Sequence, residues 1–198
     1  MSIVRKTGLL VPLAALGLAG CGINSVPTAE EQVNAEFGNL QAEYQRRSDL
    51  IGNLVETVQA SADREESTLT QITEARARAT STSLSPEQLD NPDAVQAYEE
   101  AQAGLSGARS LLGTVIMERY PELQSQQRYA DLMTQLEGTE NSILVARRDY
   151  NEAVRNYNTT IRTFPDAIGA KVIHGAEPKV PFEAASGADV APTVEFDQ

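Results

Sequence analysis

The chain has 198 residues, and 28 Asp and Glu against 16 Lys and Arg give it a formal net charge of −12 at pH 7. A balance this acidic argues against a nucleic-acid partner, because binding to phosphates depends on clustered lysines and arginines. One cysteine and one histidine exclude an intramolecular disulfide framework, a thiolate zinc cluster and any site that needs two imidazoles.

The first residues have the three parts of a secretory signal peptide. Arg5 and Lys6 supply the positive charge, residues 8–16 are apolar, and small residues follow. The apolar stretch is shorter than the ~20 residues that a membrane-spanning helix needs. We therefore expect residues 1–20 to be a cleaved signal peptide rather than a transmembrane anchor.

The end of this signal, Leu18-Ala19-Gly20-Cys21, resembles the lipobox of bacterial lipoproteins. In that motif the cysteine sulfur is diacylated and the chain is cut before it, and two or more acyl chains hold a protein stably on a membrane. The resemblance implies a lipid anchor on Cys21, a tether over residues 21–27, and a chain that faces the periplasm. Gly22 stands where an aspartate resembles an inner-membrane retention signal in enterobacteria, which favours the outer membrane over the inner membrane.

Residues 28–81 have the pattern of one long helix. Thr28 and Glu31 form a capping box at its start. Apolar residues then recur at steps of three and four, as a packed helical seam requires. The seam is Val33, Phe37, Leu40, Tyr44, Arg47, Ile51, Leu54, Val58, Ala62, Glu65, Leu69 and Ile72, with two polar exceptions. The helix could kink at Gly52 or divide at Ser61–Asp63.

Two further helices follow. Residues 81–90 are rich in Ser, Asp and Pro and predict a loop. Asn91 and Pro92 then cap and open a second helix, which ends at Tyr120-Pro121. The third helix, over about residues 125–164, has the clearest seam. Its members are Leu132, Leu136, Thr139, Ile143, Ala146, Tyr150, Val154, Tyr157, Ile161 and Phe164.

Beyond the third helix, Ile168, Val172 and Ile173 form a short apolar patch that we expect to pack on the helices. Prolines and acidic residues then predict a loosely held tail over residues 175–198. Alternating strand patterns are missing, and connections of about 5–11 residues favour antiparallel neighbours. The predicted fold is an all-α antiparallel bundle over residues 28–174, with coiled-coil-like packing and three long helices, or four if the first divides.

Several segments of the mature chain carry a family resemblance. They are Tyr44–Val58, Thr73–Ala77, Glu118–Leu123, Leu136–Asn141, Ala146–Val154, Tyr157-Asn158 and Phe164-Pro165. In this order they resemble the LemA family, and the match covers about residues 22–184. Gly52 departs from the family pattern, because relatives commonly have proline there. The resemblance implies a membrane-attached, extracytoplasmic helical bundle without an established catalytic activity. Some relatives are tied to the organisation of membrane compartments, which implies an envelope protein as partner.

Acidic residues gather on the third helix, and a helical bundle with such residues can hold two metal ions. The residues are Glu137, Glu140, Asp149 and Glu152. Sites of that kind pair Glu-x-x-His motifs on facing helices, and the single histidine, His174, lies beyond the third helix. We therefore expect neither a metal nor a cofactor.

Two pairs of neighbouring arginines lie beside acidic residues on the long helices. The candidate positions are Arg46, Arg47, Glu137, Glu140, Arg147, Arg148 and Asp149. One interpretation is that they form interhelical ion pairs, which fix the register of the helices. The other is that the two arginine pairs meet across helices and bind a carboxylate or a phosphate, which guanidinium forks suit.

Two functional hypotheses follow from these patterns. The first is a non-enzymatic lipoprotein of the cell envelope, whose bundle is a membrane-tethered scaffold that docks another envelope protein. The alternative is a ligand-sensing bundle that binds a small anion or a peptide between helices. A nucleophilic hydrolase has little support, because the sequence has one histidine and no Gly-x-Ser-x-Gly elbow.

Overall fold

The computed structural model describes residues 21–60 and 66–183, and every regular element in them is a helix. Four helices are long: α2 (Cys21–Gln59), α3 (Glu66–Ser81), α4 (Pro92–Arg119) and α6 (Gln127–Thr160). The short ones are η1 (Pro86–Gln88), α5 (Pro121–Gln124), α7 (Asp166–Gly169) and the π-helix η2 (Ala170–His174). The predicted all-α class is confirmed.

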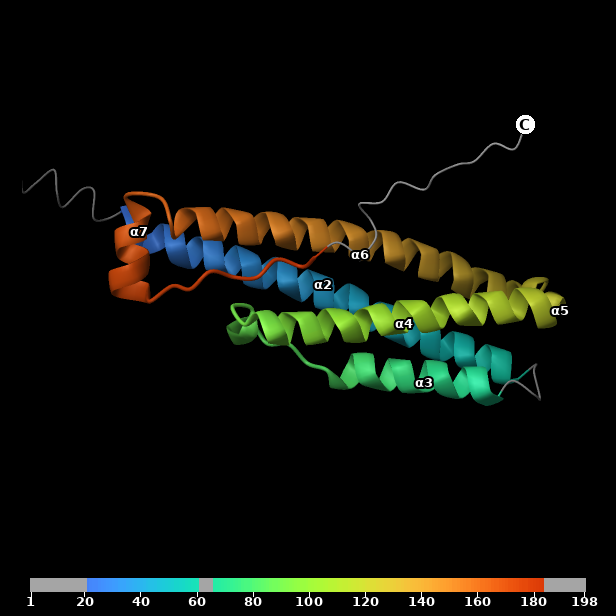
Figure 1. Ribbon diagram of the computed structural model, residues 1–198. Coiled ribbons are helices and arrows are strands. Elements are labelled where there is room, and N and C mark those ends of the chain that lie inside the picture. Colours follow the sequence, from blue (N-terminus) through green and yellow to red (C-terminus); the bar gives the residue numbers. More distant parts are fainter. Residues whose placement is uncertain (1–20, 61–65, 184–198) are drawn as a thin grey trace, which may run out of the picture.

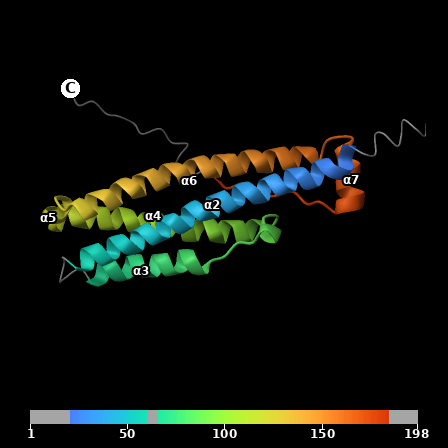
Figure 2. The ribbon, with the colours of Figure 1, turned by 180° about the vertical axis from the view of Figure 1, so that it is seen from behind.

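The long helices form an antiparallel bundle (Figure 1). α6 lies along α2 and runs in the opposite direction, while α3 and α4 form a second antiparallel pair beside the C-terminal half of α2. The view from behind shows the same arrangement (Figure 2). The predicted bundle of antiparallel neighbours is therefore confirmed.

The first predicted helix is divided in two. α2 ends at Gln59 and α3 begins at Glu66, so four long helices are present in the described residues. The predicted break at residues 61–63 lies outside the described residues. Gly52 stays inside α2, and a Cβ atom there would lie 3.0 Å from the guanidinium carbon of Arg76. The glycine thus leaves room for this arginine, whose Nε donates to the carbonyl oxygen of Ser48 at 2.9 Å.

The start of α2 differs from the prediction. The helix begins at Cys21 and contains Pro27, so residues 21–27 form its first turns instead of an extended tether. Thr28 is not a cap, because its hydroxyl donates to the carbonyl oxygen of Asn24 within the helix at 2.7 Å. The physical reason is burial: Val26 is fully packed in the core and extends the apolar seam by two turns.

The other helix boundaries follow local signals. The side chain of Asn91 accepts hydrogen bonds from the backbone N–H groups of Asp93 and Ala94, and Pro92 occupies the first turn of α4. The predicted loop before it contains the single turn η1. The cap and the first-turn proline agree with the sequence analysis.

The buried side chains form two clusters along the bundle. The aromatic cluster lies towards the N-terminus of α2 and includes Phe37, Tyr44, Tyr98, Ile143, Tyr150, Tyr157 and Phe182. The aliphatic cluster lies towards the other end and includes Leu50, Ile51, Leu54, Ile72, Leu105, Leu112 and Leu136. Except for Phe164, which is 71% exposed, the predicted seam residues of the third helix are buried.

Residues 176–183 form an extended strap that returns along the bundle (Figure 1). The N–H of Val180 donates to the carbonyl oxygen of Leu89 at 2.7 Å. Phe182 is 3% exposed and completes the aromatic cluster, with its ring centroid 5.0 Å from that of Tyr150. The prediction of a loosely held tail is therefore wrong for the described part of residues 175–198. Residues 184–198 lie outside the described residues.

The apolar patch after the third helix does not pack on the bundle as predicted. Ile168, Val172 and Ile173 are all exposed. The small residues Gly169 and Ala170 are buried instead. α7 and η2 lie across the end of the bundle (Figures 1 and 2). The exposure of Ile168, Val172 and Ile173 shows that these larger side chains face away from the core.

Candidate functional site

Arg47 is the centre of a polar layer that joins three helices. Its side chain is 2% exposed and projects from α2 towards α4 and α6. One terminal nitrogen donates to the Ser106 hydroxyl at 2.6 Å, and the other donates to the side-chain oxygen of Gln102 at 2.7 Å. The first nitrogen also lies 3.6 Å from a carboxylate oxygen of Glu140. The polar layer comprises Arg47, Gln102, Ser106, Arg109 and Glu140.

This polar layer lies at the boundary between the two core clusters. On α2, Arg47 falls between Tyr44 of the aromatic cluster and Leu50 of the aliphatic cluster. Gln102 occupies the same place on α4, between Tyr98 and Leu105. The helices α2, α4 and α6 each contribute polar side chains to the polar layer, whereas α3 contributes none. The polar layer therefore separates the aromatic cluster from the aliphatic cluster.

The positive charge of Arg47 is buried in the polar layer and is partly compensated by the carboxylate of Glu140. Burial lowers the pKa of Arg47, and the carboxylate of Glu140 opposes this shift. Arg109 also approaches Glu140, with 3.7 Å between its Nε and a carboxylate oxygen. The Nε atoms of both arginines and one oxygen of Glu140 are buried without a hydrogen-bond partner. Arg47 faces Glu140 inside the bundle and is closed to solvent, whereas the side chains of Arg109 and Glu140 are 23% and 27% exposed.

Arg147 makes a second link between elements. Its guanidinium lies 3.2 Å from a carboxylate oxygen of Glu99 on α4. The same nitrogen donates to the carbonyl oxygen of Glu183, and the guanidinium lies 5.9 Å from the ring centroid of Phe182. Burial raises the pKa of Glu99, while Arg147 lowers it. This arginine thus ties α6 to α4 and to the strap.

The remaining predicted site residues lie on the surface and do not converge. Arg46 and Glu137 are exposed. Arg148 pairs with its own neighbour Asp149 at 3.0 Å, and both are open to solvent. Adjacent residues on a helix point about 100° apart, so each arginine pair has one inward and one outward member. The cleft lined by both arginine pairs, which the second interpretation requires, is not formed.

Sequence reasoning missed two asparagines that hold the strap. The side-chain amide of Asn158 donates to the carbonyl oxygen of Lys179 and accepts from its N–H, at 2.8 and 2.9 Å. Asn151 makes the same two contacts with Phe182, both at 2.8 Å. Lys179 is itself buried and lies 3.3 Å from Glu30. The spacing of Asn151 and Asn158 could have indicated a shared role, because residues seven positions apart lie on the same face of a helix.

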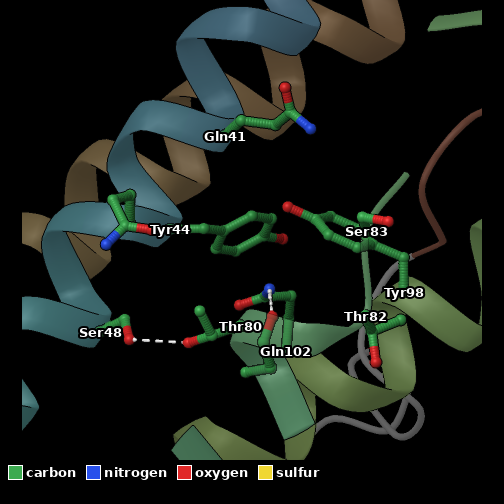
Figure 3. Close-up of a pocket in the computed structure, with 10 residues that line it drawn as sticks. Gln41, Tyr44, Ser48, Thr80, Thr82, Ser83, Tyr98 and Gln102 are labelled. Carbon is green, nitrogen blue, oxygen red and sulfur yellow. Dashed lines mark hydrogen bonds between the residues drawn. The ribbon is translucent and has the colours of Figure 1, made fainter. Parts of the chain in front are cut away.

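A pocket of about 180 Å³ opens between α2, the end of α3, the following loop and α4 (Figure 3). The hydroxyl groups of Tyr44 and Tyr98 point into it from opposite sides. Its wall is neutral and polar, formed by Gln41, Tyr44, Gln45, Ser48, Ala79, Thr80, Thr82, Ser83, Tyr98 and Gln102. None of the predicted arginines lines this pocket.

Two further properties of the described residues concern metal binding and membrane-spanning helices. Within residues 21–60 and 66–183, no three His, Cys, Asp or Glu side chains gather in a way that could hold a metal ion. Across the same ranges, none of the helices combines the length and the apolar character needed to cross a bilayer.

Comparison with known proteins gives a family. The sequence model of the LemA family matches residues 36–196. The chain is 28% identical over 160 residues to magnetosome protein MamQ 2 of Paramagnetospirillum magneticum, covering 72% of this chain and 58% of the relative. Magnetosome protein MamQ of Magnetospirillum gryphiswaldense is 27% identical over 158 residues, with the same shares covered. The chain thus spans little more than half the length of these relatives. Because the family match extends over most of the chain, the protein belongs to the LemA family.

Proposed function

We propose that the protein is a lipid-anchored, non-enzymatic scaffold of the cell envelope, with acyl chains on Cys21 and a bundle that docks another envelope protein. The lipobox-like sequence supports the anchor. Membership of the LemA family, and the magnetosome proteins among the relatives, support a role at a membrane. The chain faces the periplasm in this proposal, and Gly22 favours the outer membrane.

One observation carries the proposal: α2 begins at Cys21 without a spacer. A lipid on this residue is continuous with a helix of 39 residues, which is about 58 Å long at 1.5 Å per residue. The anchor therefore fixes which end of the bundle faces the membrane. It holds α5, at the opposite end (Figure 1), away from the lipid surface.

The anchor is tested by metabolic labelling with a fatty-acid analogue, followed by membrane fractionation. We expect label and membrane attachment in the natural chain, and no label in Cys21→Ala. Asn24→Ala is the matched control, because Asn24 is an exposed residue one turn away and its change leaves the lipobox intact. An unlabelled natural chain, or label that persists in Cys21→Ala, contradicts the proposal.

The docking role is tested by crosslinking in cells, with mass spectrometry of the captured proteins. We expect the same one or two envelope proteins with the natural chain and with Asn24→Ala, and their loss with Cys21→Ala. An abundant, anchored protein that captures nothing specific contradicts docking and favours a ligand-binding role.

The pocket of Figure 3 supports ligand binding as a second candidate function, but with a different class of ligand from the small anion. Its neutral wall of amides and hydroxyls suits a peptide or another neutral hydrogen-bonding ligand rather than a small anion. A ligand that binds the folded state raises the melting temperature, and the rise grows with the logarithm of ligand concentration above the Kd. If this candidate function is right, short peptides should raise the melting temperature and phosphate should not. An unchanged melting temperature with both would contradict it.

A further inference from the structure

Four large apolar side chains are exposed together in the segment that follows α6. They are Phe164 (71% exposed), Ile168 (60%), Val172 (77%) and Ile173 (59%). Phe164, Ile168 and Val172 follow one another at intervals of four residues. Ile168 belongs to α7, and Val172 and Ile173 belong to η2. We call these four residues the end patch. Grouped apolar side chains on a soluble surface mark sites of contact with a membrane or a partner.

The end patch and the start of α2 share one end of the molecule. α7 and η2 pack against α2 (Figures 1 and 2). The hydroxyl of Ser25 donates to a carboxylate oxygen of Asp166 at 2.9 Å, which fixes α7 to the first turns of α2. Cys21 is four residues before Ser25, or about 6 Å along the helix axis. An acyl group on Cys21 would therefore place the lipid surface beside the end patch.

The charge around the end patch differs from that of the whole chain. Residues 161–174 contain Arg162 and Lys171, both exposed, and Asp166 is their single acidic residue. The net charge of the whole chain is −12. Apolar side chains interspersed with basic ones are typical of segments that lie in a membrane interface, because the basic groups meet anionic lipid heads.

From these observations we infer that the end patch inserts into the lipid bilayer that holds the Cys21 anchor. The acyl chains give attachment, and the end patch gives a second contact that sets the tilt of the bundle. The inference rests on the proposed lipid anchor. A bilayer accounts for the exposed apolar groups, the neighbouring basic groups and the nearness of Cys21 together.

The test uses the full, acylated chain in vesicles of phosphatidylethanolamine and phosphatidylglycerol. Acylation consumes the single natural thiol, so Ile173→Cys provides the one free thiol for an environment-sensitive fluorophore. Leu144→Cys is the matched control, because Leu144 is an exposed apolar residue of α6 about 30 Å from Phe164 along the chain's helical rise.

We expect the label at position 173 to shift to the blue on vesicle binding. Lipids with nitroxides on their acyl chains should quench this label several-fold more than the label at position 144. A label at 173 that stays water-like on a vesicle-bound chain overturns the inference. A blue shift without nitroxide quenching also overturns it, because it shows contact with a second copy of the protein instead of lipid.

Failure of the anchor gives a different result. The intact mass of the purified chain is measured first, and absence of acyl mass overturns the proposed anchor together with this inference. An acylated, vesicle-bound chain with equal and weak quenching at both positions overturns the inference and leaves the anchor standing.

Discussion

Arg46 and Arg47 are neighbours in the sequence but lie in opposite environments. Arg46 is exposed, whereas Arg47 is buried in the polar layer with hydrogen bonds to two side chains of α4. A buried charge is a poor source of net stability, but removing its partner is costly and its geometry restricts alternative alignments. We therefore expect Arg47 to act on the register of α2, α4 and α6.

Arg47→Ala should destabilise the protein by about 3 kcal/mol, because Glu140 and Gln102 lose a buried partner. The measurement is urea unfolding followed by circular dichroism. Arg46→Ala is the matched control and should change the free energy of unfolding by less than about 0.5 kcal/mol. Equal effects of the two changes would show that burial of Arg47 does not matter for stability.

At the scale of elements, the strap and α6 fit each other in length. Asn151 and Asn158 are seven residues apart, which is about 10.5 Å on a helix. The backbone groups that they hold belong to Phe182 and Lys179, three residues apart, which is about 10 Å in an extended chain. This match of spacing gives the strap its register, antiparallel to α6.

Phe182→Ala should cost about 3–4 kcal/mol, because a buried ring is lost from the aromatic cluster. Phe164→Ala removes the same atoms from an exposed position and should change stability by less than about 0.5 kcal/mol. Thermal unfolding of both variants provides the measurement. If Phe182→Ala were as stable as Phe164→Ala, the strap would not be part of the folded core in solution.

Asn151→Ala should loosen the strap selectively. The change leaves the N–H and the carbonyl oxygen of Phe182 without their partner, at a cost of about 1–3 kcal/mol. Hydrogen exchange should become faster at Phe182 and remain unchanged in α3. Asn141→Ala, at an exposed position of the same helix, should leave both rates unchanged. Uniformly faster exchange in the Asn151 variant would indicate global destabilisation instead.

The helices could be predicted from the sequence because helical burial repeats every three to four residues. The strap could not, since its hydrogen bonds join residues 21 and 31 positions apart. Pro178 and Pro181 suggested looseness, yet proline also restricts the backbone to the extended form that the strap adopts. Arg47 and Glu140 were both candidates, but their pairing depends on the register between α2 and α6, which no local pattern specifies.

At the scale of the whole molecule, the two halves of the core have different chemistry. Tyr44, Tyr98, Tyr150 and Tyr157 all belong to the aromatic cluster, which lies on the same side of the polar layer as the start of α2. The phenol groups are buried, and ionisation would bring negative charge into this half. The response of the fold to high pH therefore tests the aromatic cluster more than the aliphatic one.

Burial raises the pKa of Tyr98 and of Tyr157 to about 12, and it also raises the pKa of Tyr44 and Tyr150. In the unfolded chain these groups ionise near the ordinary value of about 10. Unfolding then releases protons above that pH, so the contribution of these tyrosines to stability should be constant below pH ~10 and should fall as the pH rises from ~10 to ~12. Urea midpoints measured across this range provide the test, with phenolate absorbance recorded beside helical circular dichroism. Phenolate absorbance should lag behind that of free tyrosine and rise as helicity is lost, whereas complete ionisation near pH ~10 in a fully helical protein would contradict a buried aromatic cluster.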